Sequence, residues 1–539
     1  MHENREASAA PELKFDTGRT VKAISHKTVM HAVEDSDPGI VPMNQPNKVG
    51  HKSSAEAGEG GPGAKENSPP SHLLPTQSGI RRSQGLLGVR LAARRKPKIR
   101  FTALLHHVTV PLLRSCFYAL KRQAAPGVDG MRWKEYEQQL ETRIVDLHGR
   151  IHRGAYRAQP SRRVYLPKPD GRLRPLGIAA LEDKIVQQAV VVVLEQIYEE
   201  DFLGFSYGFR PGRGPHAALD ALNVAIERMP VKWVLDADIR GFFDLVDHEW
   251  MLKFVQHRVA DRRILRLIRK WLRAGVSENG QWSETKVGTP QGAVVSPLLA
   301  NIYLHYVFDL WVHAWRRKVA HGVVITVRYA DDLVVGFQHR EDAERFQREF
   351  KERLAKFGLE LNADKTRLIE FGRWAERDRK RRGEGKPETL DFLGFTHYCG
   401  KHREGYFALW RKTTRKRMVA KLERLKQQLQ VRRHEPIAIV GEWLHRVVTG
   451  FYNYHAVPGN FDTLRLFRHR LGRLWRQQLR RRGEKRKMSW ARFTRVCIRY
   501  LPEPRTLHFY PYQRFNVTHP RWEPYARKAP VRLCAGGGQ

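Results

Sequence analysis

An α+β fold is predicted for this chain, because short strand-like apolar runs and longer amphipathic helices share its middle section. With 539 residues, 41% of them hydrophobic, the chain is also long enough to bury a substantial core. The expected strands are residues 231–235, 323–327 and 333–337, and the expected helices include residues 179–198 and 342–357. Beyond residue 400 the pattern changes, and we expect only helices there.

The first 84 residues show little periodicity and are expected to form a disordered leader. Segments such as 58–63, rich in glycine, cannot bury enough apolar surface to offset the entropy of an ordered chain. Regular patterning begins with a basic stretch at residues 91–100, which leads into an expected apolar helix over residues 101–122. We therefore expect the folded part to begin near residue 85.

The last part of the chain is expected to form a bundle of three helices. Apolar residues recur at helical spacing along each of them, which predicts one buried face per helix. These residues are Met418, Leu422, Leu425 and Leu429, then Val440, Leu444, Val447, Phe451 and Tyr454, then Leu464, Phe467, Leu471 and Leu474. Basic clusters at residues 480–482 and 485–487 are expected on the outer face, where we favour contact with RNA.

The charge balance indicates a polyanionic partner. Lys and Arg number 97 against 56 Asp and Glu, which leaves a formal net charge of +41. Solubility alone does not require so large a charge. Trp, Tyr and Phe are interleaved with the basic residues and offer stacking surfaces for bases, so nucleic acid is favoured over an anionic membrane.

Neither a membrane span nor cysteine chemistry is expected. No apolar run approaches the ~20 residues of a spanning helix, and residues 1–18 lack the apolar centre of a signal peptide. The four cysteines form no Cys-x-x-Cys pair that would hold zinc or act as a redox couple. We therefore expect a cytoplasmic protein with reduced thiols.

Two adjacent acids, Asp331 and Asp332, stand at the tip of an expected apolar hairpin. They follow Tyr329 and Ala330 and lie between two strand-like runs. Desolvating two neighbouring carboxylates is costly unless cations neutralise them, which indicates a metal site. The alternative is an exposed polar turn, because Asp is a common turn residue.

A third acid, Asp238, follows another apolar run and precedes the aromatic pair Phe242 and Phe243. Carboxylates from two neighbouring strands suit Mg²⁺, which prefers oxygen ligands and keeps positions open for substrate phosphates. Two such ions can activate a 3′-hydroxyl and hold a triphosphate, so the three acids predict nucleotidyl transfer. Asp236 is expected farther from the hairpin tip and is not included.

Eight motifs occur in the order typical of group II intron-encoded reverse transcriptases and maturases, which this chain resembles over about residues 90–505. They are residues 125–130, 165–178, 205–211, the Asp238 strand, 288–301, the Tyr329 hairpin, 361–366 and 392–395. The resemblance implies a right-hand polymerase, with fingers and palm followed by an α-helical thumb, also called the maturase domain. The implied boundaries are 1–84 for the leader, 85–398 for fingers and palm, 399–505 for the thumb and 506–539 for a short basic tail.

The resemblance also implies the metal ligands. Asp238 and Asp331 correspond to the two principal ligands, with Asp332 supporting them and the backbone carbonyl of Ile239 completing the set. The implied cofactor is a pair of Mg²⁺ ions, with Mn²⁺ as an alternative. The implied reaction is RNA-directed DNA synthesis from deoxynucleoside triphosphates.

Five further residues match positions that contact the substrates in the family. Lys168 and Arg174 resemble residues that grip the triphosphate, a task that suits cationic side chains. Phe243 resembles the aromatic gate that excludes a 2′-hydroxyl, Gln291 a residue at the nascent base pair, and Lys365 a lysine that protonates pyrophosphate. The plain alternatives are surface charges for Lys168 and Arg174, a core ring for Phe243, a turn for Gln291 and a salt bridge for Lys365.

The resemblance implies further that the helical part, with Trp443 and residues 450–455 in its second helix, binds group II intron RNA together with the basic N-terminal block. The aromatic residues of that segment are favoured as bundle core over base stacking. The protein would assist splicing and copy the intron from a DNA primer, in the bacterial cytosol or nucleoid. Nothing in the sequence indicates an oligomeric state.

Many family members continue into a DNA-binding segment and an endonuclease with metal-binding His and Cys, which we do not expect here. We therefore expect a pre-existing DNA end to serve as primer. Two alternatives stay open. One is a splicing factor without polymerase activity, and the other is a host-adapted reverse transcriptase in defence or repair.

Overall fold

The computed structural model describes residues 83–167, 173–278, 281–284, 287–289, 292–482 and 488–518. Outside these ranges lie the predicted leader up to residue 82, the basic cluster at 485–487, and both Lys168 and Gln291. No helix within the described ranges is long and apolar enough to cross a lipid bilayer.

The region before the first strand is helical, but not as predicted. In place of one helix over residues 101–122, the chain forms a 3-10 turn η1 (Leu105–His107) and helix α2 (Val110–Ala119). The Thr109 hydroxyl caps α2 by accepting a 3.3 Å hydrogen bond from an amide of its first turn, which also contains Pro111. A capping threonine and an early proline both favour a helix start at this point.

Helix α1 (Gln84–Arg95) packs along the long buried helix α5 (Leu181–Asp201). Arg90 and Arg94 of α1 pair with Glu200 of α5 at nitrogen–oxygen distances of 2.5 and 3.0 Å. Some of the basic N-terminal residues are therefore used within the fold. The other helices of this part are α3 (Trp133–Glu137) and α4 (Leu140–His152).

A first sheet has the strand order β2-β1-β4-β5. Its strands are β1 (Ser161–Pro167), β2 (Leu173–Ile178), β4 (Val276–Glu278) and β5 (Gln281–Ser283). β1 and β2 form an antiparallel hairpin, whereas β4 runs parallel to β1.

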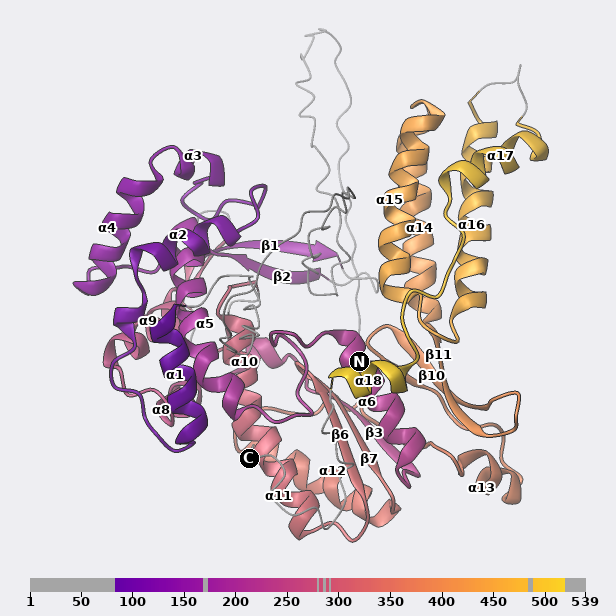
Figure 1. Cartoon of the computed structure of the whole chain (residues 1–539), viewed down its shortest axis with the longest axis horizontal. Helices are drawn as coiled ribbons and strands as arrows, with labels where there is room; N and C mark the ends of the chain where they lie inside the picture. Colours follow the sequence, from indigo (N-terminus) through magenta and orange to yellow (C-terminus); the bar gives the residue numbers. More distant parts are fainter. Residues whose placement is uncertain are drawn as a thin grey trace, which may run out of the picture. The chain divides into compact units, whose positions relative to one another are not determined.

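A second sheet, of order β6-β7-β3-β8, is antiparallel throughout. Its strands are β3 (Trp233–Asp238), β6 (Val324–Tyr329), β7 (Asp332–Phe337) and β8 (Arg367–Glu370). The three strands predicted here are confirmed, with small shifts of their ends. Helices α6 (Pro215–Arg228) and α12 (Arg340–Ala355), the latter also predicted, pack against this sheet (Figure 1).

Further helices surround the two sheets, so that the fold mixes α and β elements as predicted (Figure 1). They are α7 (Phe242–Leu245), α8 (His248–Gln256), α9 (Arg262–Arg273), α10 (Ser296–Leu304), the π-helical turn η2 (His305–Asp309), α11 (Leu310–Lys318) and α13 (Ala375–Arg381).

A third sheet, of order β11-β10-β9, contradicts the expectation that only helices follow residue 400. Its strands are β9 (Leu390–Phe392), β10 (Phe395–Lys401) and β11 (Phe407–Thr413). The alternation of apolar residues is hidden because polar residues are buried here. Arg411 of β11 is buried and pairs with Asp220 of α6 at 3.2 Å.

The predicted bundle is confirmed and gains a fourth helix. It contains α14 (Arg415–Val431), α15 (Ile437–His455), α16 (Phe461–Arg480) and α17 (Trp490–Tyr500). All residues of the predicted apolar faces are buried except Val447 and Leu474, which are partly buried. Phe451 and Tyr452 are buried in the bundle core, whereas the buried Tyr454 packs against Phe395 of β10, so all three rings are used in packing rather than base stacking.

Beyond α17 the chain returns to the second sheet. The amide of Leu507 donates to the carbonyl of Ala456 at 2.9 Å, and helix α18 (Pro511–Thr518) then packs on α6 (Figure 1). Arg514 of α18 pairs with Asp220, the same carboxylate that binds Arg411. The described part of the predicted tail is therefore docked on the folded core.

Acid is expected to weaken this C-terminal packing through His397 of β10. This residue is fully buried and lies opposite Arg411 of β11. Burial, and then the charge of Arg411, lower the pKa of His397 from 6.5 to about 3. Between these pH values only the unfolded chain is protonated at this site, so the free energy of unfolding falls as the pH falls. One such histidine contributes roughly 2 kcal/mol of loss between pH 7 and pH 5.

Urea unfolding at pH 7 and pH 5 measures this contribution. In His397→Leu the loss of unfolding free energy between the two pH values is expected to shrink by about 2 kcal/mol. The exposed His445 of α15 provides the control, because His445→Leu should leave the difference unchanged. Equal pH dependence in both variants contradicts the prediction.

Candidate active site

The second sheet brings the three predicted acids to one of its ends. Asp238 is the last residue of β3, and Asp332, the first residue of β7, lies directly opposite it in the antiparallel register. Asp331 lies in the two-residue turn between β6 and β7, which Tyr329 and Asp332 close as a pair. Two strand ends and one turn therefore place three carboxylates side by side.

Ala330, the first residue of this turn, adopts a left-handed backbone conformation with φ of 55°. Tight hairpin turns need a positive φ at this position, because only then does the turn match the twist of its strands. A residue other than glycine is strained there, because its Cβ crowds the backbone. The conformation that presents Asp331 is therefore one that the surrounding protein must hold.

The electrostatics of the turn favour a cation. Burial, and then the charge of Asp238, raise the pKa of Asp331, while Arg174 and Lys365 lower it by a smaller amount. Water reaches the side chain of Asp332, but the protein atoms crowded around it and the charges of Asp331 and Asp238 still raise its pKa to about 7. Carboxylates that resist ionisation together gain from a divalent cation between them.

The carboxylate of Asp238 faces the loop at residues 361–366. Its Oδ2 accepts hydrogen bonds from Lys365 Nζ at 3.0 Å and from Asn362 Nδ2 at 3.1 Å. The amide of Asn362 also donates to the Asp238 carbonyl at 2.8 Å, and Ile239 forms an antiparallel bridge with Leu361. Lys365 therefore occupies the salt-bridge role that the sequence left open.

Within the described ranges, no three acidic, histidine or cysteine side chains form a preformed metal cage. In this arrangement the carboxylate of Asp238 accepts hydrogen bonds from Lys365 and Asn362. The donor set itself fits Mg²⁺, because it consists of carboxylate oxygens. The pKa values of two of these carboxyl groups, Asp331 and Asp332, are raised. A bound cation would replace the Lys365 ammonium as the counter-charge of Asp238.

Phe243 lies on a helical turn and not on an extended segment. Helix α7 starts directly after Gly241, so Phe242 and Phe243 do not alternate as they would in a strand. Phe242 is buried in the core, whereas Phe243 is only partly buried and packs against that core. Phe243 thus keeps part of its ring accessible, and the plain core role belongs to Phe242.

The loop that carries the predicted Gln291 is anchored on both sides of it. The amide of Thr289 donates to the Phe243 carbonyl at 2.8 Å. A Cβ added at Gly292 would lie 2.9 Å from the Gly177 carbonyl oxygen of β2. The segment therefore connects the neighbourhood of Phe243 with the strand that carries Arg174.

Arg174 of β2 lies opposite Leu166 of β1, and its charge lowers the pKa of Asp331, so its guanidinium acts on the acids. Asp236 behaves differently, since it pairs with Arg367 at 3.4 Å and lies one strand repeat from the sheet end. Two supporting residues were missed in the sequence. Asn362 belongs to a motif that had been noted, and Arg328 is a charge within an apolar strand.

Residues 166–397 match a family model described as reverse transcriptase (RNA-dependent DNA polymerase). Protein YkfC of Escherichia coli (strain K12) is 33% identical over 330 residues, which cover 53% of this chain and 86% of that protein. The group II intron-encoded protein LtrA of Lactococcus lactis subsp. cremoris is 42% identical over 166 residues, which cover 31% of this chain. The mitochondrial nuclear intron maturase 1 of Arabidopsis thaliana is 30% identical over 92 residues, which cover 17% of this chain and 13% of that protein.

The match to LtrA covers 27% of that protein, so its whole activity is not carried over. The matched residues 166–397 include both strand ends with the three acids and the loop that holds Lys365. The chain therefore belongs to the family of group II intron-encoded reverse transcriptases and maturases, and it is an RNA-directed DNA polymerase.

Proposed function

We propose that this protein extends a DNA primer on an RNA template by two-metal nucleotidyl transfer at Asp238, Asp331 and Asp332. The observation that carries the proposal is the direct pairing of Asp238 with Asp332 across β3 and β7, with Asp331 in the adjoining turn. Two Mg²⁺ ions bound there would activate the primer 3′-hydroxyl and neutralise charge on the triphosphate and leaving oxygen. The Ile239 carbonyl is proposed as a further ligand, and Mn²⁺ as an alternative ion.

The remaining residues of the site are proposed to handle the deoxynucleoside triphosphate. Arg174, whose charge already acts on Asp331, is placed to bind phosphate oxygens in a forked geometry, with Lys168 as its partner. The accessible part of Phe243 would pack under the sugar, and Gln291 would contact the nascent pair. Lys365 holds Asp238 until a cation replaces it, and its freed ammonium is then available to protonate pyrophosphate.

In this proposal the second sheet and its helices form the palm of a right-hand polymerase. The hairpin of β1 and β2 with the N-terminal helices forms the fingers, so fingers and palm span residues 85–398. Helices α14 to α17 form the thumb within residues 399–505. The antiparallel sheet that carries the acids and the separate apolar core of the helical bundle support this division.

Primer extension tests the proposal. A DNA primer annealed to an RNA template is incubated with the full chain, deoxynucleotides and Mg²⁺, and products are resolved by length. We expect extension that EDTA stops and that added Mg²⁺ or Mn²⁺ restores. Bound template–primer without extension in either ion would instead favour a splicing factor that lacks polymerase activity.

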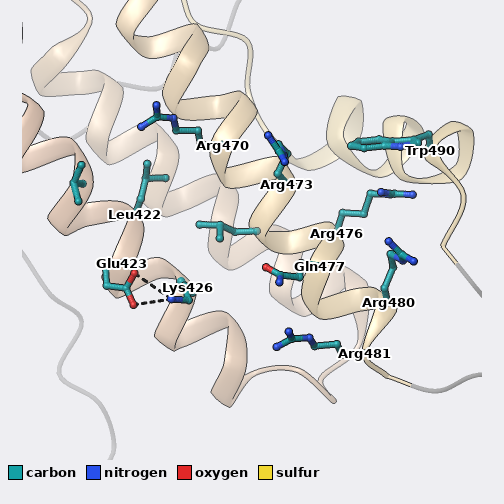
Figure 2. Close-up of a pocket in the computed structure, with 12 residues that line it drawn as sticks. Leu422, Glu423, Lys426, Arg470, Arg473, Arg476, Gln477, Arg480, Arg481 and Trp490 are labelled. Carbon is teal, nitrogen blue, oxygen red and sulfur yellow. Dashed lines mark hydrogen bonds and ion pairs between the residues drawn. The ribbon is translucent and has the colours of Figure 1, made fainter.

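We further propose that the helical bundle binds group II intron RNA and thereby assists splicing. An open groove of about 980 Å³ runs between α14 and α16, with Trp490 of α17 at one edge (Figure 2). Its lining includes Arg470, Arg473, Arg476 and Arg480 of α16, Arg481 directly after this helix, and Lys426 of α14. Guanidinium groups bind phosphate oxygens in a forked geometry, so a groove lined by arginines suits the phosphates of an RNA.

Trp490 adds a surface for an unpaired base. Its side chain is 55% exposed, and the guanidinium carbon of Arg476 lies 3.8 Å from the ring centroid. The cation fixes the orientation of the ring from one face and leaves the other face for a base. RNA-binding proteins stack unpaired nucleotides on aromatic rings in this way. The groove therefore offers contacts for both phosphates and a base.

The double variant Arg473→Gln/Arg480→Gln is expected to weaken RNA binding by roughly ten-fold at 150 mM salt, because two phosphate contacts are lost. The salt dependence should fall as well, by about one unit of slope for each lost contact. The measurement is filter binding of a transcript of the intron around the coding region at several salt concentrations.

Arg317→Gln/Arg348→Gln provides the matched control, since it removes two exposed arginines from α11 and α12 and leaves the groove intact. We expect this control to bind as the unmodified protein does. Equal loss of affinity in both double variants would mean that overall charge, and not the groove, binds the RNA.

A further inference from the structure

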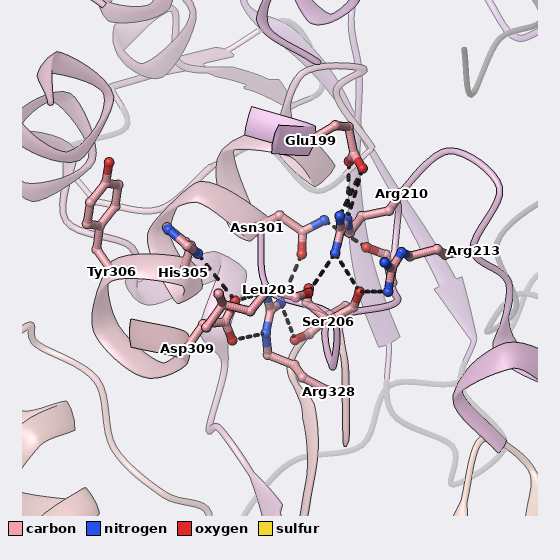
Figure 3. A network of polar contacts seen from close by, with 12 residues as sticks. Glu199, Leu203, Ser206, Arg210, Arg213, Asn301, His305, Tyr306, Asp309 and Arg328 are labelled. Carbon is pink, nitrogen blue, oxygen red and sulfur yellow. Dashed lines mark hydrogen bonds and ion pairs between the residues drawn. The ribbon is translucent and has the colours of Figure 1, made fainter. Parts of the chain in front are cut away.

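A buried ion pair lies beneath the turn that carries Asp331. Arg328 of β6 and Asp309, the last residue of the π-helical turn η2, are both fully buried (Figure 3). Arg328 Nε donates to Asp309 Oδ1 at 2.7 Å, and Arg328 Nη2 donates to Asp309 Oδ2 at 2.6 Å. Two parallel hydrogen bonds of this kind fix the plane of the guanidinium.

The third nitrogen of Arg328 reaches the turn itself. Nη1 donates to the carbonyl oxygen of Ala330 at 3.2 Å and to Asn301 Oδ1 at 2.9 Å. The side-chain Nδ2 of Asn301 donates in turn to the backbone carbonyl oxygen of Gly208 at 2.7 Å (Figure 3). The guanidinium is therefore held by a carboxylate on one side and holds the peptide between Ala330 and Asp331 on the other.

The loop at residues 205–210 adds a second hold on the same strand. The amide of Arg328 donates to the Phe205 carbonyl, and the amide of Tyr207 donates to the Arg328 carbonyl, both at 2.9 Å. Arg210 closes the loop by binding the carboxylate of Glu199 with its Nε and Nη2, the latter at 3.0 Å (Figure 3). Both the backbone and the side chain of Arg328 are thus clamped.

The position of Asp309 depends on a break in regular helix geometry. Helix α10 continues into the π-helical turn η2 before α11 begins, and Asp309 is the residue at its end. Such π-helical turns insert one extra residue into a helix and are frequent at functional sites. A regular helix at this point would rotate the carboxylate away from Arg328.

We propose that Arg328, Asp309 and Asn301 are positioning residues, which hold Ala330 in its left-handed conformation and so fix Asp331 for metal binding. This inference rests on the proposed role of Asp331 as a metal ligand. The three side chains are fully buried, so their effect on the rate is indirect. A displacement of about 1 Å in a reacting group can cost about 100-fold in rate, which sets the expected size of the effect.

The double variant Arg328→Met/Asp309→Leu separates positioning from simple stabilisation. It removes both buried charges and keeps apolar volume, a change that commonly preserves or raises stability. We expect a melting temperature close to that of the unmodified protein and template–primer affinity within about three-fold. Primer extension should still slow by about 100-fold, with half-saturation by Mg²⁺ shifted to about ten-fold higher concentration.

Asn301→Ala keeps the ion pair and removes the two hydrogen bonds of Asn301, one to Arg328 and one to Gly208, so it tests the inference if the double variant fails to fold. We expect about a ten-fold slower extension, with the same upward shift in the Mg²⁺ requirement and unchanged template–primer affinity. Normal rates and normal Mg²⁺ dependence in the folded variants would overturn the inference. Asp331→Asn, measured in parallel, reports on the proposed metal site itself, so failure of that proposal is recognised separately.

Discussion

Asp331→Asn is expected to lower the rate of primer extension by about 1,000-fold or more. The amide keeps the size of the side chain but removes the charge that a divalent cation requires, and loss of several kcal/mol of charge stabilisation corresponds to this factor. The turn itself should keep its conformation, because asparagine is a common residue in tight turns. The measurement is single-turnover extension at saturating Mg²⁺ and deoxynucleotide.

Asp236→Asn is the matched control, because it makes the same change two residues before Asp238 on the same strand. Burial raises the pKa of Asp236 to about 6 despite its pairing with Arg367, so its environment disfavours the charged form that the neutral amide removes. We expect extension within a few-fold of the unmodified protein. Similar rates in the two variants would mean that Asp331 does not bind a catalytic metal.

The second sheet was predictable because its strands are simple. β3, β6 and β7 are mostly apolar, and acids stand at the end of β3 and at the start of β7. The sequence therefore predicts that the three acids share one site. The helical bundle was predictable for a similar reason, since its buried residues recur at a constant spacing.

Contacts between distant residues were beyond the reach of the sequence. Lys365 and Asp238 are separated by 127 positions, and nothing in either local pattern indicates that one neutralises the other. Arg411 of β11 and Asp220 of α6 illustrate the same difficulty. Both are buried, but in the sequence two charged residues look like residues of an exposed segment. Strand β11 was missed for this reason.

Backbone irregularities were equally hidden. The left-handed φ of Ala330 and the π-helical turn before Leu310 have no dependable signature in the residue types, because both are imposed by packing. Asn301 lies inside a recognised motif without a role, and Arg328 lies between the predicted strand 323–327 and the motif that begins at Tyr329. The motifs therefore predict the candidate acids but not the residues that contact the turn beside them.

Gly208→Ala is expected to slow primer extension by about 100-fold, because the buried Gly208 lies directly against the turn that carries Asp331. A Cβ at this position would lie 2.3 Å from the amide nitrogen of Ala330 and 3.0 Å from the carbonyl carbon of Tyr329. Backbone atoms cannot turn aside as a flexible side chain can, so the turn itself must shift. A displacement of about 1 Å at Asp331 accounts for the expected loss.

Gly204→Ala is the control, because Gly204 lies in the same loop and an added Cβ there meets no atom within 4 Å. We expect its extension rate and its Mg²⁺ requirement to match those of the unmodified protein. In Gly208→Ala the template–primer affinity should stay unchanged while the Mg²⁺ requirement rises, since the change moves the turn that carries Asp331. A normal rate in Gly208→Ala would mean that the turn tolerates displacement, and the strained conformation of Ala330 would then have no part in catalysis.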